Sequence, residues 1–300
     1  AEALARAGVG RLRIVDRDFV EESNLQRQTL FTEADARERV PKAVAARRRL
    51  SEINSEVVCE VEVADVNNSN VERLIEDCDV VLDGTDNFAT RFLLNDACVK
   101  HNVNWIYGAA VGSYGVTLTI MPHVTPCLRC VFPETPAAAS APTCETAGVI
   151  MPIISIVAAV QVSEALNLLV GDTASLHHSL MGFDVWRNEW RPLRLTEPTP
   201  DCPTCALGRY ETLEAEAGDL ATVLCGRNAV QVSPRRAVRV DLEALADRLK
   251  VAGEVKVNRY LLRLRAGEYE LTVFEDARAI VRGTDDATTA RTLYARYVGT

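Results

Sequence analysis

Two pairs of cysteines have the spacing that metal sites use. Cys127 and Cys130 form the first pair and Cys202 and Cys205 the second, each with two residues between the thiols. One such turn can present two thiolates, and two turns complete a tetrahedral sulfur cage. A redox dithiol, which needs only one pair, and unrelated buried cysteines are the alternatives. The spacing favours a structural Zn²⁺ whose four protein ligands leave no position for water or substrate.

Acidic residues stand where two short apolar runs end. Asp16 follows the run at residues 11–15, and Asp86 lies just after the run at residues 79–83. If both runs are strands of one α/β sheet, these side chains lie at the carboxyl edge, where such sheets bind ligands. Asp16 alone is about as well explained as a solvated loop residue.

The elements that must position these side chains follow from hydrophobic periodicity. Up to about Leu195, short apolar runs alternate with helical segments, as in a parallel sheet wrapped by helices. We expect helices at 1–7, 42–52, 70–76, 90–101 and 151–170, and strands at 11–15, 57–63, 79–83, near 105–107 and at 116–121. The last helix is mostly apolar and suits a buried core or a subunit contact.

The composition changes after about Leu207. We expect strands at 229–232, 260–265, 270–274 and 279–281, and helices at 241–249 and 286–297. The predicted fold class is therefore α/β, with a Rossmann-like, zinc-containing domain in residues 1–207 and a small α+β domain in residues 208–300.

Further segments occur in a fixed order with these acids. Ser23-Asn24-Leu25-Gln26-Arg27-Gln28 follows Asp16, and Pro41-Lys42 and Thr85-Asp86-Asn87 come later. With both cysteine pairs and Thr143-Cys144-Glu145-Thr146-Ala147-Gly148, this order resembles the ThiF/MoeB/HesA family of ubiquitin-activating-type adenylyltransferases. The resemblance covers about residues 1–207. Within the family, the small domain from about Tyr210 looks like that of bacterial ThiF-type proteins.

The resemblance implies an activity and a partner. Enzymes of this family use ATP to adenylylate the C-terminal Gly-Gly carboxylate of a small ubiquitin-like sulfur-carrier protein and release pyrophosphate. A ThiS-like carrier of thiamine thiazole biosynthesis is the first expectation, and a MoeB-like molybdopterin synthase carrier is the alternative. A homodimer is also expected by resemblance.

The resemblance also assigns roles to individual residues. Asp16 would bind the ribose, and Asp86 would bind Mg²⁺, which prefers oxygen ligands. The phosphates of ATP would be held by Asn24, Arg27, Gln28 and Lys42. Arg27, Lys42 and Asp86 would be catalytic, because negative charge gathers around phosphorus in the transition state and needs cations. Arg27 or Lys42 alone would be read as a weakly paired surface charge.

Cys144 is the remaining catalytic candidate. It precedes a helix expected to begin near Ala147, where a thiol pKa can be lowered. In some relatives a cysteine in this region forms a covalent sulfur or thioester link to the carrier, and in others it is dispensable. A covalent role and a merely accessible thiol stay equally open. A sulfurtransferase or cysteine desulfurase is a further candidate partner.

Charge and composition exclude some classes of function. The chain has 300 residues, 48% of them hydrophobic, and a formal net charge of −9 without a dense Lys/Arg block, which argues against nucleic acid as a partner. The apolar stretch at residues 148–162 is interrupted by Pro152, Ser155 and Gln161, so no membrane span is expected. Cysteine spacing without a secretory signal favours a reducing, cytoplasmic location.

Two other readings remain open. A nicotinamide-dependent oxidoreductase would also contain a Rossmann-like unit, but no hydride-transfer site is evident. A non-catalytic zinc scaffold that binds a partner protein is the second. Family members carry a Gly-rich phosphate-binding turn and, further upstream, an arginine that reaches the partner subunit's active site. We expect the helix at 1–7 to be the tail of the helix that this turn opens, so ATP binding by residues 1–300 alone should be weak or absent.

Overall fold

The apolar run at residues 11–15 forms strand β1 (Arg11–Val15), with the bounds expected from the sequence. Helix α3 (Lys42–Ile53) returns the chain to strand β2 (Val58–Glu62), which pairs with β1 in parallel. Pro41 precedes α3, and its fixed φ suits the start of a helix. This strand–helix–strand unit confirms the α/β reading of the N-terminal part.

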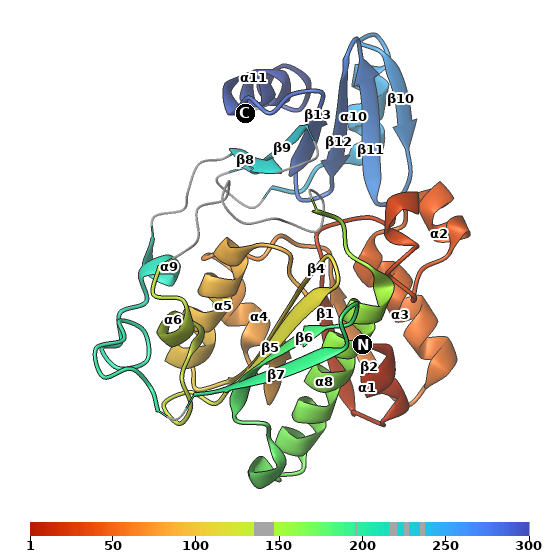
Figure 1. The fold of residues 1–300 in the computed structure, drawn as a ribbon. Helices are drawn as coiled ribbons and strands as arrows, with labels where there is room; N and C mark the ends of the chain where they lie inside the picture. The colour runs from red at the N-terminus through yellow and green to blue at the C-terminus, as the bar shows by residue number, and fades with distance from the viewer. Residues whose placement is uncertain (135–146, 196, 216–220, 225–227, 235–237, 300) are drawn as a thin grey trace. The chain divides into compact units, whose positions relative to one another are not determined.

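The computed structural model describes residues 1–134, 147–195, 197–215, 221–224, 228–234 and 238–299 (Figure 1). The chain divides into two compact units, Ala1–Ala217 and Gly218–Thr300. The division lies after the predicted boundary at residues 207/208, and the independent folding of the two parts stays a prediction. The remaining elements of the first unit are α1 (Glu2–Arg6), η1 (Glu22–Asn24), α2 (Glu33–Glu38), α4 (Val71–Ile75), β3 (Val80–Leu82), α5 (Phe88–Lys100), β4 (Asn104–Val111), β5 (Tyr114–Ile120), α6 (Leu128–Val131), α8 (Met151–Leu169), η2 (Thr173–Ser175), β6 (Ser179–Asp184), β7 (Glu189–Arg194) and α9 (Glu211–Glu214).

The larger sheet of this unit is only partly parallel. Its strand order is β3-β4-β5-β6-β7, and only the β3–β4 pair is parallel. The wholly parallel pattern suggested by the sequence is therefore corrected for β5 to β7. The two residues Gly112 and Ser113 connect β4 to β5, and so short a loop can join only antiparallel strands.

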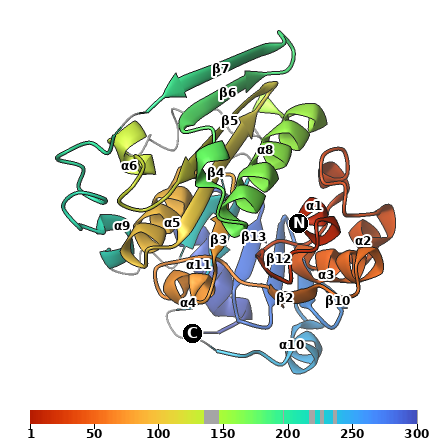
Figure 2. The ribbon, with the colours of Figure 1, turned by 90° about the horizontal axis from the view of Figure 1, so that it is seen from below.

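Helices α5 and α8 pack on opposite faces of the sheet (Figure 2). On the α5 face, Trp105 and Tyr107 are buried in one cluster with Phe92. On the α8 face, Ile106 packs with Ala165, together with apolar side chains of α1, β1 and β3. This cluster packs Leu12 of β1 with Val80 and Leu82 of β3. The expectation that both runs belong to one sheet is corrected, because β1 pairs only with β2 in a separate two-stranded sheet of the described residues.

Helix α8 has one buried side and one exposed side. Ile153, Val157, Gln161 and Ala165 lie at spacings of four residues and are buried, whereas Val170 just after the helix is 76% exposed. By length and composition alone, α8 is the one helix among those described that could cross a membrane. Helices packed in the core of soluble proteins are also long and apolar enough to meet this criterion. Because α8 packs on β4 and β5, we interpret it as a helix that covers the sheet.

Gly108 of β4 is required by the close approach of α8. A Cβ atom there would lie 2.5 Å from Nε2 of Gln161. That amide donates to the carbonyl oxygens of Asp83 (3.0 Å) and Ile106 (2.9 Å). We expect Gly108→Ala to lower the free energy of unfolding by about 1–3 kcal/mol in urea titrations, because Gln161 must move and release both bonds. Gly10→Ala, where no atom lies within 4 Å, is the control, and equal effects of the two would contradict this account.

The second unit is an α+β arrangement. Its strands are β8 (Ala221–Leu224), β9 (Ala229–Val232), β10 (Glu254–Val257), β11 (Leu261–Ala266), β12 (Tyr269–Phe274) and β13 (Ala279–Arg282), and its helices are α10 (Leu242–Leu249) and α11 (Ala287–Tyr297). The strands form one antiparallel sheet in the order β10-β11-β12-β13-β9-β8. Leu245 and Ala290 of the two helices are buried in one cluster with the sheet.

Candidate functional sites at the strand ends and the cysteine cluster

Asp16 directly follows β1, as predicted. Its backbone N–H donates to the carbonyl oxygen of Glu62 at the end of β2 (3.2 Å), and its carboxylate accepts from the backbone N–H of Asp18 (2.8 Å). Burial raises the pKa of Asp16, and the charge of Lys42 acts in the opposite direction. The carboxylate is thus held at the strand end with one hydrogen bond already made.

Lys42, the first residue of α3, lies against the same segment. Its backbone N–H donates to the carbonyl oxygen of Asp18 (2.9 Å), and its Nζ forms an ion pair with Oδ2 of Asp18 (3.2 Å). The lysine is buried, so its long side chain has few alternative positions. A fixed cation at a helix N-terminus is suited to an anionic ligand.

Arg17 joins this group, although it was not among the predicted site residues. Its Nη1 donates to Oδ1 of Asp65 (2.8 Å), and its Nε lies 3.9 Å from Oδ1 of Asp18. Burial acts to lower the pKa of Arg17, but the charges of Asp65, Asp18 and Asp86 outweigh it and raise that pKa. The alternation Asp16-Arg17-Asp18 is the only signal in the sequence that could have indicated it.

Asp86 lies in the short segment between β3 and α5 and is exposed. Its Oδ1 accepts from Nδ2 of Asn87 (3.3 Å), while Asn87 caps α5 by accepting from the N–H of Thr90 (2.8 Å). The charge of Asp86 also contributes to the raised pKa values of Arg17 and Arg91, after the larger contributions of Asp65 and Asp83 and against the effect of burial. An exposed carboxylate oxygen fits the ligand chemistry of Mg²⁺ with bound phosphate.

The segment Ser23–Gln28 forms its own turn. Asn24 is buried and its Oδ1 accepts from the backbone N–H of Glu21 (3.3 Å), and Nη1 of Arg27 donates to the carbonyl oxygen of Ser23 (2.9 Å). Oε1 of Gln28 is buried without a hydrogen-bond partner among the residues that the structure describes. Within those residues no hydrogen bond or ion pair joins Arg27 or Gln28 to Asp16 or Asp86, so their phosphate-binding roles stay predictions.

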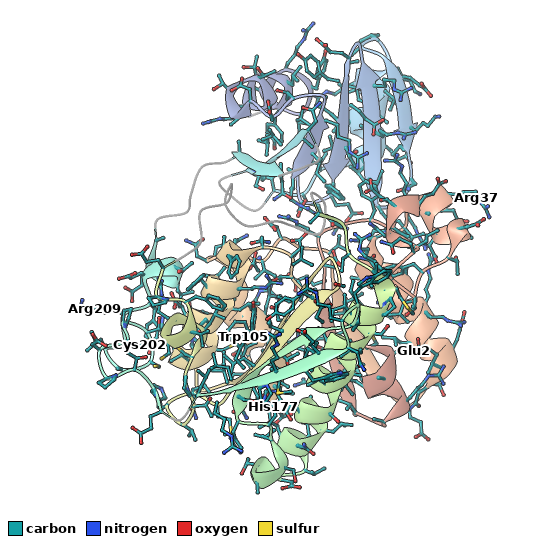
Figure 3. All side chains as sticks on the ribbon, in the orientation of Figure 1. Glu2, Arg37, Trp105, His177, Cys202 and Arg209 are labelled. Carbon is teal, nitrogen blue, oxygen red and sulfur yellow. The ribbon has the colours of Figure 1, made fainter. Side chains whose placement is uncertain are left out.

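The four predicted zinc ligands lie together. Their sulfurs lie within 4.8 Å of one another, with Sγ–Sγ distances of 3.9 Å for Cys127–Cys130, 3.6 Å for Cys127–Cys202 and 3.4 Å for Cys130–Cys205. Sulfurs at about 2.3 Å from a tetrahedral zinc ion lie about 3.8 Å apart. The donor set therefore fits Zn²⁺. Figure 3 shows Cys202, from the segment between β7 and α9, beside helix α6.

The thiols of the cluster share the charge unequally: the hydrogen bond to Cys130 raises the pKa of Cys127, whereas the pKa of Cys130 is lowered. Hydrogen bonds from Cys127 and Cys205 hold the pKa of Cys130 well below its usual range. The backbone N–H of Thr199 also points to Sγ of Cys130 (3.4 Å). Such donors stabilise negative charge on sulfur in the same way as around other thiolate metal sites.

Helix α5 supports both cysteine turns through two polar residues that were not predicted. Oδ1 of Asn95 accepts from the backbone N–H of Leu128 in the first turn (2.8 Å). Asp96 accepts from Oγ1 of Thr204 in the second turn (3.0 Å) and from the N–H of Thr212 (2.9 Å). Both side chains are fully buried. The pair Asn95-Asp96 inside an apolar helix was the available signal.

Cys144 lies outside the described residues, so its role as a catalytic residue stays a prediction.

Comparison with known proteins supports the family resemblance that the order of the sequence motifs suggested. The model of the ThiF family matches residues 1–204. "Sulfur carrier protein ThiS adenylyltransferase" of Bacillus subtilis is 44% identical over 301 residues, which cover 100% of this chain and 88% of that protein. "SAMP-activating enzyme E1" of Haloferax volcanii is 37% identical over 70% of this chain and 77% of its own length.

A solved structure gives the same fold. The E. coli protein MccB, in a crystal structure with ATP, aligns with a TM-score of 0.58 and 20% identity over 68% of this chain and 61% of that chain. At this identity the likeness bears on the fold alone. The family model, in contrast, spans most of the chain and includes the strand-end acids and the first three ligands of the cysteine cluster. The chain therefore belongs to the ThiF family.

Proposed function

We propose that this protein uses ATP to adenylylate the C-terminal Gly-Gly carboxylate of a ThiS-like sulfur-carrier protein in thiamine thiazole biosynthesis. The observation that carries the proposal is the match over the whole chain, at 44% identity, to a protein named as a ThiS adenylyltransferase. The match to the Haloferax protein covers only 70% of the chain. The similarity to the ThiS-type relative thus extends over the small second unit as well.

In this reaction a carboxylate oxygen of the carrier attacks the α-phosphorus of ATP. The bond between that phosphorus and the oxygen bridging to the β-phosphate breaks, and pyrophosphate leaves with the electron pair. The product is a carrier acyl-adenylate. No general base is needed, because the carboxylate is already ionised at neutral pH. The demand on the protein is to place cations around the phosphates.

The strand-end residues suit this demand. Asp16 would accept hydrogen bonds from the ribose hydroxyls, as acids at this edge of α/β sheets do. Lys42, held by Asp18 at 3.2 Å, would donate to the phosphates with its remaining N–H groups, and Asn24, Arg27 and Gln28 would complete their binding. Asp86 would hold Mg²⁺, which supplies charge neutralisation to the phosphate oxygens.

Further parts of the proposal concern the assembly and its partners. A homodimer could cover the exposed side of α8, where Met151 and Leu169 are 38% and 39% exposed. The Cys144 thiolate would attack the carrier acyl-adenylate and release AMP to form a thioester, or it would take the outer sulfur of a persulfide on a sulfurtransferase or cysteine desulfurase, whose cysteine leaves as a thiolate. Zinc in the cysteine cluster would be structural. We propose a cytoplasmic location for the reaction.

Pyrophosphate exchange tests the proposal. The full-length protein, with any residues that precede Ala1, is incubated with ATP, Mg²⁺, labelled pyrophosphate and a purified carrier. We expect label in ATP only when a carrier with an intact Gly-Gly terminus is present. A molybdopterin synthase carrier in a parallel reaction tests the alternative substrate. Absence of exchange with every carrier, together with tight carrier binding, would favour a non-catalytic scaffold instead.

A further inference from the structure

A buried ion pair joins the two ends of the segment that carries Asp86. Nε of Arg91 on α5 is 2.9 Å from Oδ2 of Asp83 at the end of β3. The two side chains are 7% and 0% exposed. Buried pairs of this kind contribute little net stability, since an apolar replacement of the same shape often does as well. The effect of this ion pair is therefore to be found in the groups that it contacts.

The pair fixes the backbone of the residue before Asp86. Oδ1 of Asp83 accepts from both the backbone N–H (2.8 Å) and Oγ1 (2.7 Å) of Thr85. Nη2 of Arg91 donates to the carbonyl oxygen of Thr85 on the other side. Both polar backbone groups of Thr85 are thus bonded to the ion pair, so the direction in which the chain enters Asp86 is set by it.

The ion pair is itself held to the sheet. Nη2 of Arg91 also donates to the carbonyl oxygen of Gly108 on β4 (3.2 Å). The amide of Gln161 on α8 donates to the carbonyl oxygen of Asp83 (3.0 Å). The guanidinium lies near the rings of Phe88 and Tyr107, at 5.7 and 5.4 Å from their centroids. Arg91 therefore connects the segment between β3 and α5 to strand β4 of the sheet.

We propose that Arg91 is a positioning residue for the adenylylation: paired with Asp83, it fixes the main chain of Thr85 and thereby directs the carboxylate of Asp86 toward the metal ion that accompanies the nucleotide. The inference rests on the proposed function. Burial acts to lower the pKa of Arg91, but the charge of Asp83, with a smaller contribution from Asp86, raises it.

The metal dependence of the reaction tests this role. The variants are Arg91→Lys, Arg91→Met and Asp83→Asn in the full-length protein. Two quantities are measured: the Mg²⁺ concentration for half-maximal pyrophosphate exchange, and the Kd of Mn²⁺ for the protein–ATP complex by electron paramagnetic resonance. We expect both to rise about tenfold, as for other partners of metal ligands, with excess Mg²⁺ restoring part of the exchange rate.

Arg278→Lys is the matched control. Arg278 is a buried arginine of the second unit, 2% exposed, and its Nε lies 3.5 Å from Oδ2 of the half-exposed Asp276, so its replacement perturbs a buried guanidinium outside the first unit. We expect its metal dependence to equal that of the wild type. Should Arg91→Met not fold, Arg91→Lys and Asp83→Asn decide the question.

The outcomes separate the inference from the proposed function. Wild-type exchange with unchanged metal dependence in the folded Arg91 and Asp83 variants, even with lowered melting temperatures, overturns the positioning role and leaves a structural one. Absence of exchange in the wild type overturns the proposed function. In that case an unchanged Kd of Mn²⁺ for the variant–ATP complexes would still reject the positioning role.

Discussion

Replacing Asp86 by alanine is expected to lower the rate of carrier-dependent pyrophosphate exchange by at least about a hundredfold. The carboxylate is exposed in the segment between β3 and α5, and in the proposed function it binds the metal ion of the nucleotide. Without it, charge on the phosphates is neutralised less during attack on the α-phosphorus. The rate is measured with labelled pyrophosphate at saturating ATP and carrier.

Asp79→Ala provides the control for this loss. Asp79 is also an exposed aspartate, but it precedes β3 and so lies at the opposite end of the same strand. We expect it to keep the wild-type exchange rate. Among the residues that the structure describes, Asp86 accepts one hydrogen bond, from Nδ2 of Asn87, so the melting temperature of Asp86→Ala should stay close to that of the wild type. Full exchange activity in a folded Asp86→Ala protein would remove Asp86 from the proposed site.

Features that are local in the sequence could be predicted. The apolar run at residues 11–15 is β1, and the run at 229–232 is β9, both with the predicted bounds. The strand-end position of Asp16 follows from the first run. The close packing of Cys127, Cys130, Cys202 and Cys205 follows from two turns of known geometry. Short-range patterns determine these features almost alone.

One helix start could also have been recognised from the sequence. Helix α2 (Glu33–Glu38) was not predicted, although Thr32 and Asp35 form a capping box in which each side chain accepts from the other's backbone N–H. A Ser or Thr followed three residues later by an acid is a recognised start of a helix. The short length of α2 weakened its periodic pattern, so the cap was the better guide.

Contacts between distant segments could not be predicted. The ion pairs Arg17–Asp65 and Arg91–Asp83 depend on how β1, β3 and α5 pack, and no spacing in the sequence encodes that packing. The pairing of β6 with β5 joins strands that are separated by the segment containing α6 and α8, and periodicity does not report such a pairing. Arg17 directly follows the predicted Asp16, and Asp83 and Arg91 lie in the sequence on either side of the predicted Asp86.

Replacing Cys202 by serine is expected to remove zinc and to destabilise the first unit strongly. Binding of a structural zinc ion contributes on the order of 10 kcal/mol to folding in small zinc domains. In this larger unit we expect the free energy of unfolding to fall by more than about 3 kcal/mol. Zinc content by mass spectrometry and urea titration measure the two effects. Cys59→Ser, which removes a half-buried thiol outside the cluster, should keep one zinc ion per chain.

Exchange activity should fall in Cys202→Ser only as a consequence of the lost structure. Asn95 and Asp96 of α5 bind the two cysteine turns, and the same helix begins at Phe88, directly after the segment that carries Asp86. Loosening the turns therefore frees the helix that orients the proposed metal-binding carboxylate. At low temperature, where the variant is still folded, its remaining activity should follow its folded fraction. A zinc-free variant with wild-type structure and melting temperature would show that the cluster does not stabilise the fold.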